Sequence, residues 1–437
     1  MNVFWTELDP PAPEKYVRDP LGLQNMAEML AEAIIPGITS RTVKVRYYSL
    51  LCWGLNLIER NKGELQVPEY AWDNTVEGYL MTFEKILVLS IVAHYSGKAN
   101  VPDEEKPLLG IESADDMFKL GGSKFDLGSK YKLLINQRFQ GCIGAYRTSL
   151  TETSLIQEST LRVTENGREL SAALRYNGRI EKLVCEALRK KELGLHALKV
   201  LERVFSLNPE RMTKQETKIL DARIRLANPT RAAAFAGFVS MGGLEDLSVI
   251  EATLTATHID REFREKLALI RAFEYFSLGV GRLFELALND LEKGAPTAVK
   301  ERSSVDSTGI LGKIREGSDC DAHVCLISLE NVANEIKARL IPYLGSENST
   351  YAKGLSDFVQ HVITAVESQL PAQKKVDELI QVLVARHRSI KGTWSWIFPD
   401  DSGRLKAVKP NIDFRPAHSY RISSVRSLRR ELSVKHI

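Results

Sequence analysis

The chain has 437 residues, of which 44% are hydrophobic, and its formal net charge is +3. This length and apolar content exclude an intrinsically disordered chain and predict two or three domains with substantial buried cores. The most apolar run, residues 86–93, is much shorter than the roughly 20 residues that cross a bilayer, so we expect no membrane span.

The N-terminal segment is rich in proline and charge, so it lacks the basic start and apolar middle of a secretory signal. The cysteines are odd in number and scattered along the chain: Cys52, Cys142, Cys185, Cys320 and Cys325. Such a set is typical of reduced thiols and not of a disulfide framework. We therefore expect a cytoplasmic protein.

Apolar residues recur at intervals of three and four over most of the chain, which is the spacing of amphipathic helices. Helices are predicted at about 23–35, 41–60, 73–95, 261–293, 326–344, 351–370 and 371–390, with further helical sequence throughout 180–292. The predicted fold class is mainly α and multi-helical, with a possible small winged-helix-like α+β module.

Changes in composition divide the chain into five predicted segments. They are an N-terminal helical domain (1–97), a possible winged-helix-like module (98–178), a central helical domain (179–293), an exposed loop (294–325) and a C-terminal helical region with a basic, aromatic-interleaved tail (326–437).

The winged-helix interpretation depends on one short string. Leu161 and Val163 suggest a β segment, Asn166-Gly167 a turn, and Arg168 the start of an amphipathic helix. An incidental strand-turn-helix would have the same pattern, and both interpretations stay open.

The helix predicted over 41–60 carries Arg41, Lys44 and Arg46 in its first turns, where positive charge opposes the helix dipole. These side chains either pair with carboxylates inside the protein, such as those of the proline-rich N-terminal segment, or meet an external anion. From Tyr47 to Ile58 the same helix is apolar nearly all round, so it is expected in a core.

Motifs for known chemistry are missing from the sequence. Neither the phosphate-binding GxxxxGK[ST] nor a strand-bounded GxGxxG occurs, and GxSxG and HExxH are also absent. The string DCDAHVC at 319–325 lacks a second ligand pair for zinc. His258 and Asp260 stand where a helix should begin, with Asp260 as its cap. We expect no catalytic residues, metal or cofactor, and lean towards a protein that is not an enzyme.

The C-terminal segment has the strongest functional signal. From residue 386 on, twelve basic residues face four acidic ones, a local charge of +8, which leaves −5 for residues 1–385. Such segregation favours a polyanion or an acidic partner. Aromatic residues alternate with the basic ones, as in nucleic-acid-binding segments, although a hydrophobic cap with a solvated rim is equally consistent.

We therefore predict a surface that binds double-stranded DNA with little base preference. Its predicted residues are Arg386, Arg388, Lys391, Arg421, Arg426, Arg429 and Arg430. The last three follow the spacing i, i+3, i+4, which places them on one helix face, expected to be solvent-facing. Secondary candidates are Arg41, Lys44, Arg46, Arg162 and Arg168.

Four segments near the two ends of the chain are RDPLGL at 18–23, PGITSRTVKVRYYSLLCW at 36–53, ARHRSIKG at 385–392 and SYRISSVRSL at 419–428. They resemble segments of uncharacterised bacterial proteins encoded near anti-phage defence genes, such as helicases and phospholipase-D-like nucleases. Roughly forty residues carry the likeness, which implies a context of anti-phage defence and brings no active site with it.

The expected function is a non-enzymatic DNA-binding or adaptor subunit of a multi-protein defence system, with double-stranded DNA and other defence subunits as partners and no membrane. Two alternatives stay open. One is a protein-only scaffold that docks a helicase or nuclease, and the other is an effector nuclease with an unfamiliar site.

Overall fold

The computed structural model describes residues 19–95, 110–120, 122–128, 131–238, 246–257, 259–293, 321–392, 395–399, 405–407 and 418–434. Helix accounts for 72% of these residues. The described strands form two small antiparallel pairs, β1 with β2 and β3 with β4. The predicted mainly α fold class is thus confirmed.

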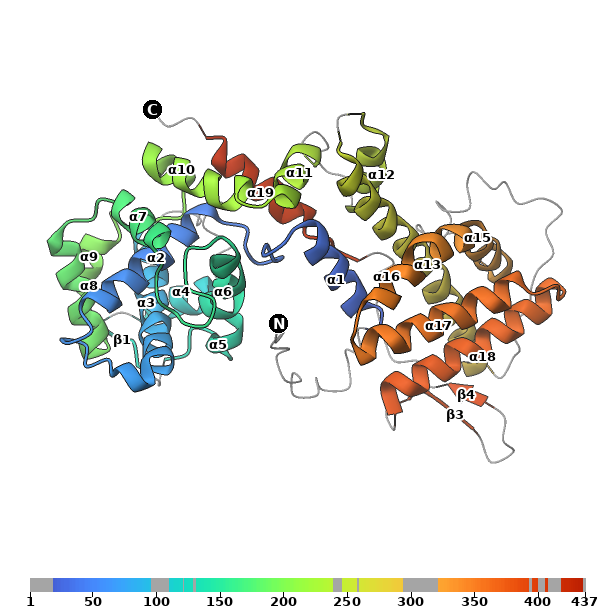
Figure 1. The fold of residues 1–437 in the computed structure, drawn as a ribbon. Coiled ribbons are helices and arrows are strands. Elements are labelled where there is room, and N and C mark those ends of the chain that lie inside the picture. Colours follow the sequence, from blue (N-terminus) through green and yellow to red (C-terminus); the bar gives the residue numbers. More distant parts are fainter. Residues whose placement is uncertain are drawn as a thin grey trace. The chain divides into compact units, whose positions relative to one another are not determined.

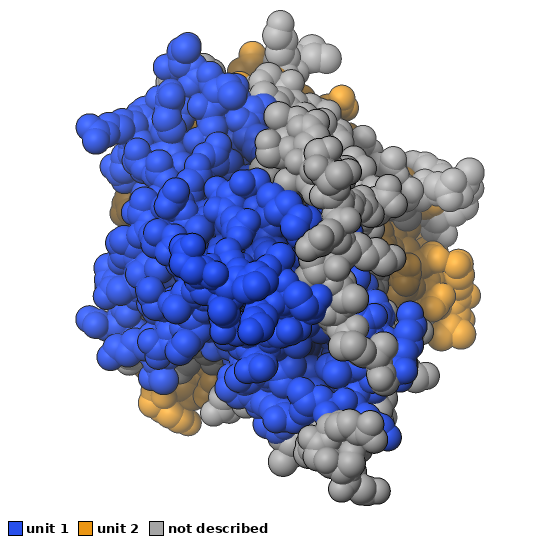
Figure 2. Space-filling view, turned by 90° about the vertical axis from the view of Figure 1, so that its right-hand side faces the viewer, with its two compact units in different colours: residues 1–33, 243–420 blue, residues 34–242, 421–437 orange. Residues whose placement is uncertain are grey.

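The chain divides into two compact units, coloured separately in Figure 2. Unit 1 comprises residues 1–33 and 243–420, and unit 2 comprises residues 34–242 and 421–437. Each unit therefore combines sequence from both ends of the chain. The finer boundaries expected from the sequence stay predictions.

Unit 1 contains most of α1 (Gln24–Ile34) and the described helices between residues 246 and 391 (Figure 1). These are α12 (Asp246–Thr255), α13 (Arg261–Glu292), α15 (Ala322–Glu335), the π-helix η4 (Ile336–Leu340), α16 (Ile341–Ser346), α17 (Thr350–Glu367) and α18 (Ala372–Lys391). The strands β3 (Ile397–Pro399) and β4 (Leu405–Ala407) complete its described elements. Helix α13 packs against α12, α15 and α18.

The long helix α13 begins and continues as its sequence predicts. Asp260 caps it by accepting a hydrogen bond from the backbone N–H of Phe263 at 2.9 Å. His258 lies outside the described residues. Gly279 would weaken an isolated helix, yet α13 runs through it unbroken. A Cβ atom at Gly279 would lie 2.8 Å from Leu329 of α15, so the glycine permits the close approach of these two helices.

Unit 2 contains the elements from α2 to α11, together with the last helix of the chain. They are α2 (Val45–Arg60), η1 (Glu69–Ala71), α3 (Trp72–Tyr95), α4 (Ile111–Lys119), β1 (Lys124–Asp126), α5 (Gln137–Gln140), α6 (Cys142–Glu152), α7 (Glu165–Ala173), α8 (Gly178–Lys190), β2 (Glu192–Gly194), α9 (Leu195–Leu201), η2 (Pro209–Arg211), α10 (Lys214–Leu220), the π-helix η3 (Asp221–Leu226), α11 (Pro229–Gly237) and α19 (Ile422–Leu432). In the first sheet, Phe125 of β1 stands opposite Leu193 of β2.

Helix α2 forms the centre of unit 2, as its apolar sequence predicts. Trp53 is only 3% exposed. Its ring lies 5.1 Å from that of Tyr176, 5.8 Å from that of Phe83 and 5.9 Å from that of Phe205, measured between centroids. The burial expected for this helix is confirmed.

The strand-turn-helix expected around residue 166 is wrong in its details. Helix α7 already begins at Glu165, so Asn166 and Gly167 are helical and do not form a turn. The cause is Thr164, whose hydroxyl accepts a hydrogen bond from the backbone N–H of Gly167 and so caps the helix. Val163, which was expected in a β segment, forms an isolated antiparallel bridge with Ile156.

The predicted loop at 294–325 also ends earlier than expected. Asp321 accepts a hydrogen bond from the N–H of Val324 at 3.0 Å and caps α15, which begins at Ala322. Residues 294–320, which include Asp319 and Cys320 of the DCDAHVC string, lie outside the described residues. The described residues hold no group of three or more metal-ligating side chains.

Cys52, Cys142, Cys185 and Cys325 are free thiols in buried positions. In the described part of the chain, no helix is both long enough and apolar enough to cross a membrane.

Candidate nucleic-acid interface

The predicted C-terminal site residues belong to two different units. Arg386, Arg388 and Lys391 lie on α18 of unit 1. Arg421 is the N-cap residue of α19 in unit 2, and the same helix carries Arg426, Arg429 and Arg430.

In unit 1, Arg386 binds the backbone of the N-terminal segment. Its Nε donates to the carbonyl of Leu21 at 3.0 Å, and its Nη1 donates to the carbonyl of Gly354 at 3.2 Å. Burial lowers the pKa of this guanidinium, against the opposing influence of the Tyr351 hydroxyl and of Asp19. Arg386 thus has a structural role.

The next residue, His387, makes a second link to the N-terminal segment. Its Nδ1 lies 2.9 Å from the carbonyl oxygen of Pro20, and its Nε2 lies 3.1 Å from the backbone nitrogen of Trp396. Because the carbonyl must accept and the backbone N–H must donate, this geometry assigns the neutral ring with its proton on Nδ1. We call the contacts of residues 20–22 with α18 the unit 1 clasp.

The remaining two cations of α18 are more accessible. Arg388 is exposed, and Lys391 is half-buried. Burial lowers the pKa of Lys391, while the carboxylate of Asp19 acts in the opposite direction. Arg388 therefore stays the more available candidate on this helix.

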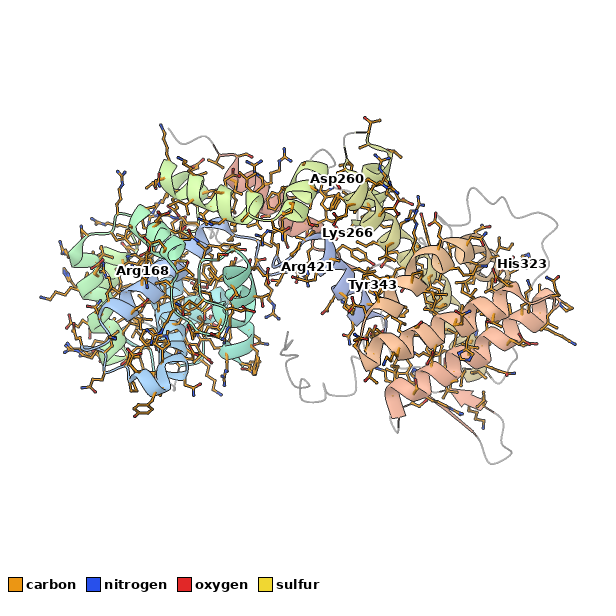
Figure 3. The ribbon with its side chains drawn as sticks, viewed as in Figure 1. Arg168, Asp260, Lys266, His323, Tyr343 and Arg421 are labelled. Carbon is orange, nitrogen blue, oxygen red and sulfur yellow. The ribbon has the colours of Figure 1, made fainter. Side chains whose placement is uncertain are left out.

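In unit 2, Arg421 also holds the N-terminal part of the chain. Figure 3 labels this residue. It has a left-handed backbone conformation, with φ of 62°, and its Nη1 donates to the carbonyl of Ile38 at 3.0 Å. One turn into α19, the hydroxyl of Ser427 donates to the carbonyl of Val43 at 2.9 Å. We call the contacts of residues 38–45 with α19 the unit 2 clasp.

A buried ion pair lies in the unit 2 clasp. Lys44 Nζ is 2.9 Å from the carboxylate of Glu431, and the two side chains are 6% and 3% exposed. The other carboxylate oxygen of Glu431 accepts the backbone N–H of Val45 at 2.8 Å. Burial raises the pKa of Glu431, and Lys44 opposes that rise. Lys44 is thus paired internally, although its partner comes from the last helix and not from the N-terminal segment.

The other basic residues near α2 differ in exposure. Arg46 is buried, with its Nε 3.9 Å from the Glu216 carboxylate and its Nη1 3.5 Å from the carbonyl of Asn208. Arg41 is exposed and donates to the carbonyl of Phe139 at 3.0 Å. Arg46 is therefore closed to an external anion, whereas Arg41 lies at the surface.

Arg162 and Arg168 are each matched by a carboxylate. Arg162 pairs with Glu69 and lies over the ring of Trp72, 4.1 Å from its centroid. Arg168 is on α7 and is labelled in Figure 3. Its guanidinium lies 3.3 Å from the carboxylate of Glu59. These pairs give the two arginines a structural role at the surface of unit 2.

Two of the three arginines on α19 are not simply solvent-facing, which corrects the expectation from sequence. Arg426 donates to the carbonyl of Phe238 at 3.4 Å, and Arg429 donates to the carbonyl of Phe235. These carbonyls belong to the C-terminal end of α11, where the last carbonyls of a helix need donors from outside it. Both arginines are half-buried as a result, whereas Arg430 is exposed.

Arg429 also lines a hollow of about 580 Å³ between α10, η3, α11 and α19, all within unit 2. Its lining residues are Lys214, Thr217, Lys218, Asp221, Arg225, Ala232, Phe235, Ala236, Arg429, Leu432 and Ser433. We call it the cationic hollow, because its charged lining consists of four basic side chains and one carboxylate.

A smaller hollow of about 190 Å³ shares Arg429 with it and is also lined by Arg426 and Arg430. The three arginines predicted on α19 thus contribute to two hollows of the same unit.

The local sequence explains how α10 and η3 present these charges. Thr213 and Glu216 form a capping box that starts α10. At Asp221 the helix continues as the π-helix η3, a conformation often found at functional sites. Asp221 accepts two hydrogen bonds from Arg225, at 2.7 Å and 2.5 Å, which orients that guanidinium.

The positive charges around the cationic hollow lie close enough to repel one another. Burial lowers the pKa of Arg429, and the nearby positive charge of Arg225 lowers it further. Since Asp221 neutralises only one cation, an excess of positive charge remains around a concave surface. Such a site attracts an anion.

Three cations of the hollow were missed from the sequence: Lys214, Lys218 and Arg225. Their spacing of four and seven residues is the signal that could have identified them, because it places them along one face of a helix. The strong charge asymmetry of the C-terminal segment drew the prediction to α18 and α19 instead.

No protein-family model, curated protein or solved structure matches this chain.

Proposed function

We propose that this protein is a non-enzymatic DNA-binding or adaptor subunit of a multi-protein bacterial anti-phage defence system. The observation that carries the DNA-binding part is the cationic hollow. Lys214, Lys218, Arg225 and Arg429 converge on it from α10, η3 and α19, against the single carboxylate of Asp221.

Phosphates of duplex DNA are the ligands that suit this surface. Lysine and arginine side chains bind phosphate oxygens by charge-assisted hydrogen bonds and release condensed counterions from the duplex. Arg430, which is exposed on α19, extends the positive surface beyond the hollow. Phosphate contacts carry no sequence information, so the proposed binding has little base preference.

Salt dependence tests this proposal directly. Binding is measured by the fluorescence anisotropy of a labelled duplex of about 20 bp. The logarithm of the binding constant should fall linearly with the logarithm of the salt concentration, with a slope of about −0.9 for each phosphate contacted. The double variant Lys214→Ala/Lys218→Ala should reduce that slope.

The matched control is Lys182→Ala/Lys199→Ala, which removes two exposed lysines from α8 and α9 of the same unit. It should keep the wild-type slope. Equal slopes for all three proteins would contradict the proposed interface, and absence of binding by the wild type would contradict the DNA-binding function.

The defence context rests on the resemblance of the terminal segments. The similar segments of the two chain ends contact each other within each unit, as Leu21 does with Arg386 and Ile38 with Arg421. Deleting the gene should lower the resistance of its host to phage, measured as plating efficiency; unchanged plating for every phage tested would contradict this context.

A protein-only scaffold is the second candidate function. Four of the predicted DNA-binding arginines donate to backbone carbonyls: Arg386, Arg421, Arg426 and Arg429. Less positive charge is therefore accessible to a ligand than the sequence suggests, which favours the scaffold. An acidic patch on a helicase or nuclease subunit would then meet the remaining cations. A protein interface with an apolar core should weaken less with salt than phosphate binding does.

A further inference from the structure

We infer that the cationic hollow binds a phosphomonoester, the dianionic phosphate found at the end of a nucleic-acid strand or on a free nucleotide. This inference rests on the proposed function where the strand end is the source. It goes beyond that function because a duplex backbone offers only phosphodiesters.

The balance of charge distinguishes the two kinds of phosphate. Asp221 offsets Arg225, which leaves Lys214, Lys218 and Arg429 as three further positive charges around one concavity. A phosphodiester carries one negative charge, whereas a phosphomonoester carries about −1.5 to −2 at pH 7 and offers three acceptor oxygens. Three converging cations match the second more closely.

The arginines of the hollow are held in place before any ligand arrives. Arg225 is oriented by its two hydrogen bonds to Asp221, and Arg429 is oriented by the carbonyl of Phe235. A donor that is already ordered loses less entropy on binding than a freely rotating one. The exposed lysines on α10 add point charges that adjust to the ligand.

The size and the remaining lining of the hollow indicate more than a bare phosphate. The hollow is a depression of about 580 Å³ that is open to solvent, and it leaves room beside a phosphate for a group attached to it. Ala232, Ala236 and Leu432 give it an apolar part. The hydroxyls of Thr217 and Ser433 donate to the carbonyls of Thr213 and Arg429, so towards a ligand their oxygens act as acceptors for the hydroxyls of a sugar. Such a lining suits a phosphate together with the sugar of the nucleotide that bears it.

The test compares ligands that differ only in their terminal phosphate. Fluorescence anisotropy is measured with two versions of one DNA duplex, in which one strand is labelled at its 3′ end and carries either a 5′-phosphate or a 5′-hydroxyl. The protein should prefer the phosphorylated duplex about tenfold. Lys214→Ala/Lys218→Ala should abolish this preference, and Lys182→Ala/Lys199→Ala should retain it.

A competition arm with adenosine 5′-monophosphate and with adenosine distinguishes the two sources. Competition by the monophosphate but not by adenosine supports a phosphomonoester site. If neither duplex binds while direct titration detects the monophosphate, the inference stands and the DNA-binding function fails. Equal affinity for both duplexes, with no effect of the monophosphate, overturns the inference while leaving DNA binding intact. If no ligand binds at all, both fail.

Alanine is the best helix former, so the lysine variants should fold. Circular dichroism and a melting curve of each variant verify this, and a variant that does not match the wild type is replaced by Lys214→Gln/Lys218→Gln.

Discussion

The basic residues of the two clasps and those of the cationic hollow have the same charge but opposite surroundings. Arg386 and Arg421 donate to backbone carbonyls in the N-terminal part of the chain. Lys44 pairs with the carboxylate of Glu431 on the last helix. Lys214 and Lys218 are exposed at the rim of a hollow that has a single carboxylate. A local excess of positive charge along the sequence therefore does not identify a positive surface; the partners of each side chain do.

The first group is also chemically suited to its internal role. A guanidinium has five N–H donors in a fixed plane, which allows one arginine to satisfy two carbonyls at once. Arg386 does this with Leu21 and Gly354. The lysines of α10 have compact, strongly hydrated charges and stay in water.

The largest expected effect comes from breaking the unit 2 clasp. Glu431→Ala leaves Lys44 buried without its carboxylate and removes the acceptor of the Val45 N–H, so it should destabilise the protein by about 3–5 kcal/mol. Glu169→Ala, which removes an exposed carboxylate from α7, should change stability by less than about 0.5 kcal/mol. Urea denaturation measures both, and equal values would refute the buried pair.

A smaller effect is expected in the unit 1 clasp. Arg386→Ala leaves the carbonyls of Leu21 and Gly354 without this donor and should cost about 1–3 kcal/mol. Arg388→Ala, two residues further along the same helix, removes an exposed arginine and should cost less than about 0.5 kcal/mol. Thermal unfolding of the two variants compares the internal and the external arginine on one element. A similar loss in both would end that distinction.

His387 should make the unit 1 clasp sensitive to acid. Its pKa is lowered from the usual 6.5, first by burial and then by the charges of Lys391 and Arg388, against the opposing carbonyl of Pro20. Protonation of Nε2 would also remove the acceptor of the Trp396 N–H. Because the unfolded chain binds the proton more tightly, this stability is present above pH 6.5 and is lost as the pH falls from there towards the folded pKa.

His387→Asn, which does not titrate, tests that assignment. Denaturation curves collected between pH 8 and pH 5 should show a smaller loss of stability in acid for the variant than for the wild type. The difference in the free energy of unfolding should be about 1.4 kcal/mol for each unit by which the pKa of His387 differs between the folded and unfolded states. An identical loss in both proteins would assign the acid sensitivity to other groups.

The sequence was informative where a feature depends on neighbours along the chain. Apolar spacing predicted α2 and α13, and Asp260 identified the start of α13, because helices and their caps are local. The clasps could not be predicted, since Lys44 and Glu431 are separated by most of the chain. The turn expected at Asn166 failed because a competing local signal, the Thr164 cap, began the helix earlier.

For the candidate site, the sequence predicted the helix that carries Arg426, Arg429 and Arg430 but not what those arginines contact. Donation from Arg426 and Arg429 to α11 depends on tertiary packing, which periodicity does not reveal. The helical spacing of Lys214, Lys218 and Arg225 was visible in the sequence, whereas the hollow formed by four separate elements was not.

The smallest effect on stability, and the most informative one for function, is expected at the hollow. Lys214→Ala/Lys218→Ala removes two exposed side chains from α10, so each substitution should change the free energy of unfolding by less than about 0.5 kcal/mol. The same variant should lower the salt slope of DNA binding by up to about two, roughly one for each phosphate that the lysines no longer bind. Arg386→Ala should do the reverse, lowering stability while leaving the salt slope unchanged, because its guanidinium is engaged with backbone carbonyls. If the lysine variant unfolds more easily and binds DNA with the wild-type slope, the hollow is part of the scaffold, and the distinction between internal and external cations no longer holds in unit 2.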